Sequence, residues 1–102
     1  MKYGINLLLW TDSMHDGLIP VIETLKEMGY DGVEMPLFEP DKELYAEWGK
    51  KLDAIGLERT AVTIRSADAN PISPDASVRK AAVDALKKTI DCCHAAGVKL
   101  LA

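Results

Sequence analysis

Met28-Gly29-Tyr30-Asp31-Gly32-Val33-Glu34-Met35-Pro36 decides the fold, because this stretch ends one element and begins the next. Apolar residues with helical spacing lead up to Met28, and a glycine just after them is typical of a helix end. Residues 32–35 then predict a strand, which Pro36 ends because proline cannot donate to a strand ladder. A helix is therefore followed at once by a short strand.

The same junction occurs at Ile55-Gly56 and at Ala96-Gly97. Strands are predicted at residues 5–10, 60–64 and 98–102 as well as 32–35, with a helix in each interval. Regular alternation of strands and helices implies a parallel sheet with right-handed crossovers. The long polar loops of this chain follow the strands, which is where such sheets usually carry their functional site.

Two helix starts carry local signals. Asp41 is the predicted N-cap of the second helix, which should end at Gly56. For the third helix, Ser73 is the predicted N-cap, with Pro74 at the first helical position and Asp75 in the first turn.

The choice between an open sheet and a barrel depends on the first loop. No glycine-rich phosphate turn follows the first strand, and Trp10 stands there instead, which suits the mouth of a barrel. We therefore predict the α/β class and a parallel (β/α)8 TIM barrel. Because such a barrel needs about 250 residues, we expect residues 1–102 to be an incomplete domain, an N-terminal half-barrel that stops inside its fourth strand.

The composition excludes several classes of protein. Hydrophobic residues make up 48% and charged residues 27%, as in globular chains, and a net charge of −4 without a basic stripe argues against a nucleic-acid partner. No apolar run is long enough for a membrane span and no signal peptide is recognised, so we expect no membrane partner and a cytoplasmic location. Cys92 and Cys93 fit neither a disulfide framework nor a metal motif, and we expect them to be reduced packing residues.

Three segments carry a family resemblance: residues 1–5 leading to Trp10, residues 28–34, and Ser73-Pro74-Asp75 followed by Ser77-Val78-Arg79. In their order and amino-acid sequence they resemble the N-terminal part of the xylose isomerase-like TIM barrels, and most of all the D-tagatose and D-psicose (allulose) 3-epimerases. The resemblance implies a ketose substrate, proton transfer through an enediolate, and a homo-oligomeric full-length protein.

The resemblance also implies a divalent metal, Mn²⁺ or Mg²⁺, held by two Glu, an Asp and a His on later strands. We therefore expect no catalytic residue and no metal ligand within residues 1–102, and an isolated chain that is inactive.

We expect five residues to contact the sugar: Asn6, Trp10, Met14, Glu34 and Val62. The resemblance places Asn6, Trp10, Met14 and Val62 at positions that face the substrate in the family, whereas Glu34 is expected there because it ends the second strand at the barrel mouth. Trp10 could equally pack at the barrel mouth, and Val62 could belong to the core. Met14 replaces an aromatic residue of several epimerases, which puts the substrate preference in doubt. Glu34 could accept a hydrogen bond from a sugar hydroxyl, or could form an ion pair with a lysine or arginine of a neighbouring strand.

Other polar residues have simpler interpretations. His15 could act as an acid or base but is more simply solvated, and Arg65 could bind an anionic substrate such as a sugar phosphate or lie in solvent. His94 suits a helix C-terminus. A solvated helix face explains the acidic residues Glu39, Asp41, Glu43 and Glu47.

The sequence leaves more than one function open. The first is the N-terminal part of a metal-dependent sugar isomerase or ketose 3-epimerase. The second is a non-catalytic half-barrel that self-associates or binds another subunit. A third keeps the barrel but acts on inosose, hydroxypyruvate or abasic DNA, and the acid-rich composition argues against DNA.

Overall fold

The computed structural model describes residues 1–102 and confirms the predicted alternation of strands and helices. Short 3-10 turns η1 (Leu7–Leu9), η2 (Asp16–Leu18) and η3 (Ala67–Ala69) lie in the loops after the first and third strands. The strands and helices are β1 (Gly4–Asn6), α1 (Ile19–Glu27), β2 (Gly32–Pro36), α2 (Lys42–Ile55), β3 (Glu58–Val62) and α3 (Ala76–Ala95).

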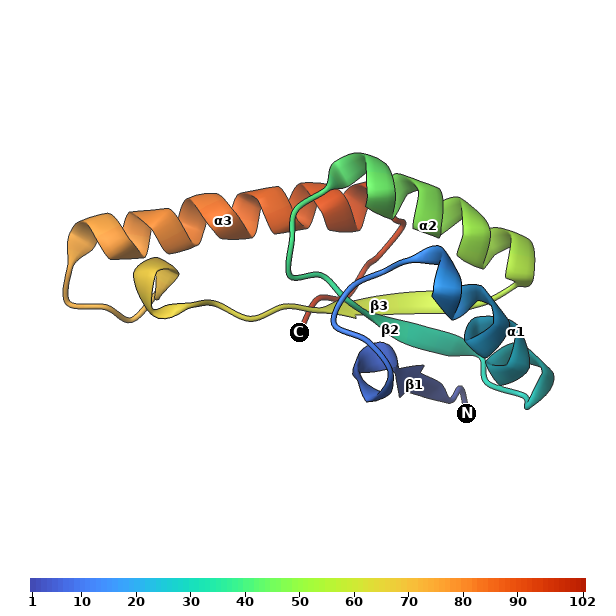
Figure 1. Cartoon of the computed structure of the whole chain (residues 1–102). Coiled ribbons are helices and arrows are strands. Elements are labelled where there is room, and N and C mark those ends of the chain that lie inside the picture. Colours follow the sequence, from blue (N-terminus) through green and yellow to red (C-terminus); the bar gives the residue numbers. More distant parts are fainter.

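The strands form one parallel sheet in the order β1-β2-β3, as consecutive β/α units do (Figure 1). The predicted fourth strand is present as a parallel bridge between Ala61 and Leu101, where the Ala61 N–H donates to the Leu100 carbonyl at 3.1 Å. The chain thus has the α/β architecture of a partial barrel.

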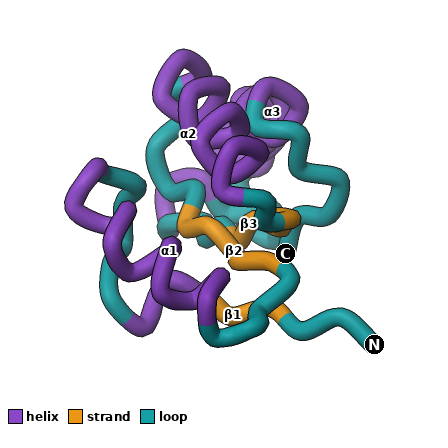
Figure 2. The backbone as a smooth tube through the Cα atoms, turned by 90° about the vertical axis from the view of Figure 1, so that its right-hand side faces the viewer, coloured by secondary structure: helices purple, strands orange, loops and turns teal.

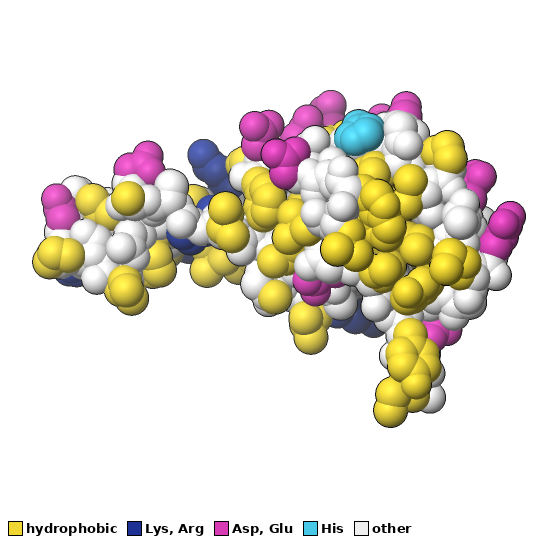
Figure 3. All heavy atoms as spheres, turned by 60° about the horizontal axis from the view of Figure 1, so that its bottom comes forward, with side chains coloured by type: hydrophobic (Ala, Val, Ile, Leu, Met, Phe, Trp, Pro, Cys, Tyr) yellow, Lys and Arg dark blue, Asp and Glu magenta, His cyan; other side chains and the backbone are white.

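The helices give the molecule its shape. α2 and α3 pack against each other (Figure 2), and α3 runs well beyond the strands (Figure 1). The principal extents are therefore unequal, at 48 × 26 × 23 Å. Hydrophobic side chains are grouped over the broad body of the molecule, whereas the arm that contains the start of α3 is narrow (Figure 3). None of the helices is both long and apolar enough to cross a membrane.

The predicted helix ends are confirmed. Gly29, Gly56 and Gly97 have φ angles of 98°, 89° and 69°, a region that favours glycine because it lacks a Cβ atom. Asp41 is the N-cap of α2, since its carboxylate accepts from the Leu44 N–H at 3.1 Å. Each helix therefore ends, and the chain turns toward the next strand, at the glycine that the sequence indicates.

The predicted start of the third helix is wrong by two residues. Asp75 is the N-cap, because its carboxylate accepts from the Ser77 N–H at 2.8 Å. Ser73 instead accepts from the Asp75 N–H at 3.1 Å and so closes a turn before the helix. Arg79 holds this turn by donating to the carbonyls of Ser73 and Pro74. The serine therefore serves the loop, and the aspartate serves the helix.

Two strand boundaries also differ from the prediction. β1 ends at Asn6 and continues as η1, because the Asn6 side chain accepts from the Leu8 N–H at 2.7 Å and so caps the turn. β3 spans Glu58–Val62 and begins two residues earlier than predicted, because the Glu58 N–H already donates to the Asp31 carbonyl at 2.9 Å.

One face of the sheet packs against the helices and forms the core. Met35 from β2 and Ala61 from β3 are fully buried with Trp48 and Leu52 from α2. Cys92 and Cys93 are buried free thiols in the same cluster, which confirms their packing role. Burial raises the pKa of both thiols, Cys92 being further affected by the charge of Asp41.

Helix α2 approaches the end of α3 so closely that residue 49 must be glycine. A Cβ atom at Gly49 would lie 2.9 Å from the Ala96 carbonyl oxygen. We predict that Gly49→Ala lowers the free energy of unfolding by about 1–3 kcal/mol, because the two helices must move apart. Urea denaturation measures this change. The neighbouring exposed Lys50 supplies the control, since Lys50→Ala should change stability by less than about 0.5 kcal/mol. Unchanged stability of Gly49→Ala would contradict the predicted clash.

Tyr45 joins α2 to the end of β2 by a buried hydrogen bond. Its hydroxyl donates to the Pro36 carbonyl at 2.6 Å, and its side chain is only 2% exposed. We predict that Tyr45→Phe lowers the free energy of unfolding at pH 7 by about 1–3 kcal/mol, because the buried carbonyl loses its donor.

The same residue makes stability depend on alkaline pH. Burial, with smaller effects from Cys92 and Glu39, raises the pKa of Tyr45 from 10.0 to about 12. Between these values the unfolded chain has lost a proton that the folded chain keeps, so stability falls as pH rises, by up to about 1.4 kcal/mol per pH unit. Denaturation at pH 9 to 12 should therefore show the stability gap between wild type and Tyr45→Phe narrowing. A constant gap would exclude Tyr45 as the source.

Candidate functional site

The open face of the sheet is the face opposite the helices, and it is polar. Side chains alternate between the two faces of a strand, so Val33 and Met35 point to the core while Gly32 and Glu34 belong to the open face. The members of the open face are Gly4 and Asn6 from β1, Gly32, Glu34 and Pro36 from β2, and Glu58, Thr60 and Val62 from β3, and those with polar side chains are Asn6, Glu34, Glu58 and Thr60.

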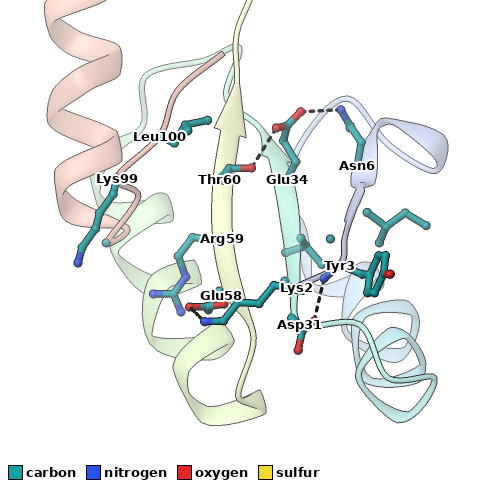
Figure 4. Close-up of a pocket in the computed structure, with 15 residues that line it drawn as sticks. Lys2, Tyr3, Asn6, Asp31, Glu34, Glu58, Arg59, Thr60, Lys99 and Leu100 are labelled. Carbon is teal, nitrogen blue, oxygen red and sulfur yellow. Dashed lines mark hydrogen bonds and ion pairs between the residues drawn. The ribbon is translucent and has the colours of Figure 1, made fainter.

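Three side chains of the open face form a hydrogen-bonded network across β1, β2 and β3. The Asn6 Nδ2 donates to Glu34 Oε1 at 2.9 Å, and the Thr60 Oγ1 donates to Glu34 Oε2 at 3.0 Å (Figure 4). The strand register explains the contact, since Asn6 pairs with Glu34 and Glu34 pairs with Thr60. Both oxygens of the carboxylate are therefore held from the two sides.

Asn6 has a second partner that fixes its own position. Its Oδ1 accepts from the Leu8 N–H at 2.7 Å while its Nδ2 donates to Glu34. The residue that ends β1 therefore also orients the carboxylate on β2. An amide suits both tasks because it offers an acceptor and a donor in one plane.

Glu34 has no cationic partner. The alternative of an ion pair with a neighbouring lysine or arginine is wrong, since both carboxylate oxygens accept from neutral groups and none of the four ion pairs of the chain includes Glu34. Lys2 pairs instead with Glu58 at 2.7 Å, where both side chains are exposed. This hydrogen bond and the charge of Glu58 raise the pKa of Lys2.

An open hollow of about 660 Å³ lies along this face. It runs from the Lys2–Glu58 pair to the network of Asn6, Glu34 and Thr60, and Leu100 borders it on the side of the fourth strand (Figure 4). A ligand in the hollow would meet the carboxylate of Glu34, which is half-buried.

The structure brings together two of the five predicted sugar-facing residues. Asn6 and Glu34 line the hollow in direct contact, whereas Trp10, Met14 and Val62 do not line it. Trp10 is 48% exposed beyond η1, Val62 is half-buried at the end of β3, and Met14 is 3% exposed and belongs to the core cluster. Their contact with a substrate stays a prediction, and the burial of Met14 gives it a packing role in this chain.

Thr60 is the member of the network that sequence reasoning missed. The available signal was its spacing from Val62, because residues two apart on a strand share a face. Arg65, by contrast, is turned toward α3, where its Nη2 donates to Thr89 Oγ1 at 2.8 Å. His15 is exposed just before η2, and His94 lies in the last turn of α3.

The arrangement can orient hydroxyl groups through one carboxylate, and it does not form a metal site. No group of three or more His, Cys, Asp or Glu side chains is placed to hold an ion, and Glu34 is flanked by an amide and a hydroxyl. A carboxylate with two neutral donors keeps about two of its roughly four acceptor positions free.

A family model described as xylose isomerase-like TIM barrel matches residues 22–102. No curated protein matches the chain. Among solved structures, a D-allulose 3-epimerase from Methylomonas sp. in complex with D-allulose is 26% identical, with a TM-score of 0.82 over 99% of this chain and 35% of that one. A D-psicose 3-epimerase solved in the presence of D-fructose is 25% identical, with a TM-score of 0.82 over 99% of this chain and 36% of that one.

A third solved structure gives the same result. D-psicose 3-epimerase from Clostridium cellulolyticum, solved with D-tagatose, is 24% identical, with a TM-score of 0.80 over 99% of this chain and 36% of that one. The chain therefore spans little more than a third of the length of these proteins. Its strands and helices superpose on the sugar isomerase and epimerase fold, and the family match covers most of its residues. The chain belongs to the xylose isomerase-like TIM barrel family.

Proposed function

We propose that residues 1–102 form the N-terminal part of a sugar isomerase or epimerase of the ketose 3-epimerase type. In this proposal the carboxylate of Glu34, which Asn6 and Thr60 hold, accepts hydrogen bonds from hydroxyl groups of the sugar. The observation that carries the proposal is the half-buried carboxylate of Glu34, which two neutral donors hold on an open face and no cation neutralises. The names of the similar solved structures support a ketose as the ligand.

The chemistry of Glu34 suits a sugar. An ionised carboxylate accepts stronger hydrogen bonds from hydroxyl groups than a neutral acceptor does. Asn6 and Thr60 keep the carboxylate in one orientation, so a sugar hydroxyl meets a prepared acceptor. Trp10 and Val62 stay proposed as further contacts at the carboxyl ends of β1 and β3, and Met14 as a residue that supports the first loop.

The proton transfer through an enediolate is assigned in this proposal to carboxylates outside residues 1–102. The expected Mn²⁺ or Mg²⁺ would polarise the substrate oxygens. The residues present do not fit such an ion, because they contain no group of three ligands. We derive no step through the metal, and we expect the 102-residue chain to bind sugar without turning it over.

Sugar binding is tested by titrating the chain with D-psicose and D-tagatose while recording its ¹H–¹⁵N NMR spectrum. The expected result is saturable shifts for Asn6, Glu34 and Thr60. Glu34→Gln should weaken binding about tenfold, which corresponds to about 1.4 kcal/mol, because the charged acceptor becomes neutral.

Glu47 provides the matched control. It is an exposed carboxylate on α2 that does not line the hollow, so Glu47→Gln removes the same charge and should leave the affinity within about twofold. If neither D-psicose nor D-tagatose shifts these signals, the result contradicts the proposal and favours the non-catalytic half-barrel. Equal weakening by Glu34→Gln and Glu47→Gln would show a general charge effect and would contradict the role of Glu34.

A further inference from the structure

We propose that Thr60 is a positioning residue of the sugar site, which fixes the carboxylate of Glu34 for a pair of neighbouring sugar hydroxyls. This inference rests on the proposed function and goes beyond it, because it assigns a role to a residue of β3 and names the ligand group as a vicinal diol. Thr60 acts through Glu34 and is not assigned a contact with the sugar.

The first step is the geometry of the carboxylate. The last side-chain torsion of a free glutamate is broad, so its carboxylate plane has no fixed direction. In this chain Thr60 holds Oε2 at 3.0 Å and Asn6 holds Oε1 at 2.9 Å from the opposite side (Figure 4). Rotation of the carboxylate would break both hydrogen bonds. The two contacts together therefore define the plane.

The second step separates Thr60 from Asn6. The amide of Asn6 also caps η1 through Leu8, so its position serves the loop as well as the network. The hydroxyl of Thr60 forms a hydrogen bond only with Glu34. Thr60 is therefore the member whose polar group serves the carboxylate alone.

The third step is that no cation pairs with Glu34. The Lys2 ammonium is paired with Glu58, and the Arg59 guanidinium donates to Asp53 and to the Gly49 carbonyl. Lys99 also lines the hollow, but no hydrogen bond or ion pair joins it to Glu34. Neutral donors hold Glu34, so its negative charge stays available to a ligand. About one acceptor position remains on each oxygen, and two adjacent hydroxyl groups of a sugar can occupy both.

The experiment compares Thr60→Val with Thr60→Ser in the 102-residue chain. Valine keeps the branched shape and the strand preference but removes the hydroxyl, whereas serine keeps the hydroxyl. Titration with D-psicose by NMR should show Kd raised about five- to tenfold in Thr60→Val, the effect of one hydrogen bond to a charged group. Thr60→Ser should return Kd to within about twofold of wild type, because it restores that bond.

A spectroscopic signal tests the positioning step without any sugar. The side-chain amide protons of Asn6 report its contact with Glu34, and they should shift in Thr60→Val but not in Thr60→Ser. Thr24→Val is the control, because it makes the same atomic change on α1, where the hydroxyl donates to the Pro20 carbonyl. It should alter neither the Asn6 amide signals nor Kd.

The outcomes separate the two proposals. Sugar binding that is equal in wild type and Thr60→Val would overturn the role of Thr60 while the proposed function stands. Weakening by Thr60→Ser as large as that by Thr60→Val would also overturn it, since the methyl packing and not the hydroxyl would be responsible. If the wild-type chain does not bind D-psicose, the proposed function is overturned. The recognition of a vicinal diol is then overturned as well, even if the Asn6 side-chain amide signals shift in Thr60→Val.

Discussion

Neighbouring parallel strands place Asn6, Glu34 and Thr60 at one level of the sheet. This register determines which residues form the polar network and which form the core. Because side chains alternate along a strand, the residues between them, such as Val33 and Ala61, must point the other way. Those residues belong to the core cluster together with side chains of α1, α2 and α3. A shift of one residue would bury the carboxylate and expose the core, so the packing of the helices also maintains the polar network.

Much of the fold could be predicted because its signals are local. A glycine that ends a helix needs only its own backbone conformation, and Gly29, Gly56 and Gly97 all have the positive φ that the pattern indicates. The start of α3 was harder, since Ser73 and Asp75 are both good caps two residues apart. The choice between them depends on Arg79, which binds the carbonyls of Ser73 and Pro74 and so keeps the serine in the loop.

The site was predictable in part, for a different reason. Asn6 was found through the family resemblance and Glu34 through its place at the end of the second strand, and the structure places them in contact. Thr60 was not found, because a threonine in a strand is explained by strand preference alone, and only the register shows that it faces Glu34. Met14 shows the opposite case, because it was predicted to face the sugar and is buried in the core. One apolar residue in a polar loop has no periodicity, so its burial in the core depends on how the loop folds back.

The two carboxylates of the open face argue for a functional interpretation of Glu34. Glu58 is exposed and paired with Lys2, and such a surface pair contributes only about 0–1 kcal/mol to stability. Glu34 is half-buried and has no counterion, and each of its carboxylate oxygens accepts from a neutral donor on a neighbouring strand. A carboxylate held in one orientation and left without a cation is what a site that binds hydroxyl groups requires, and a surface ion pair such as that of Glu58 does not provide it.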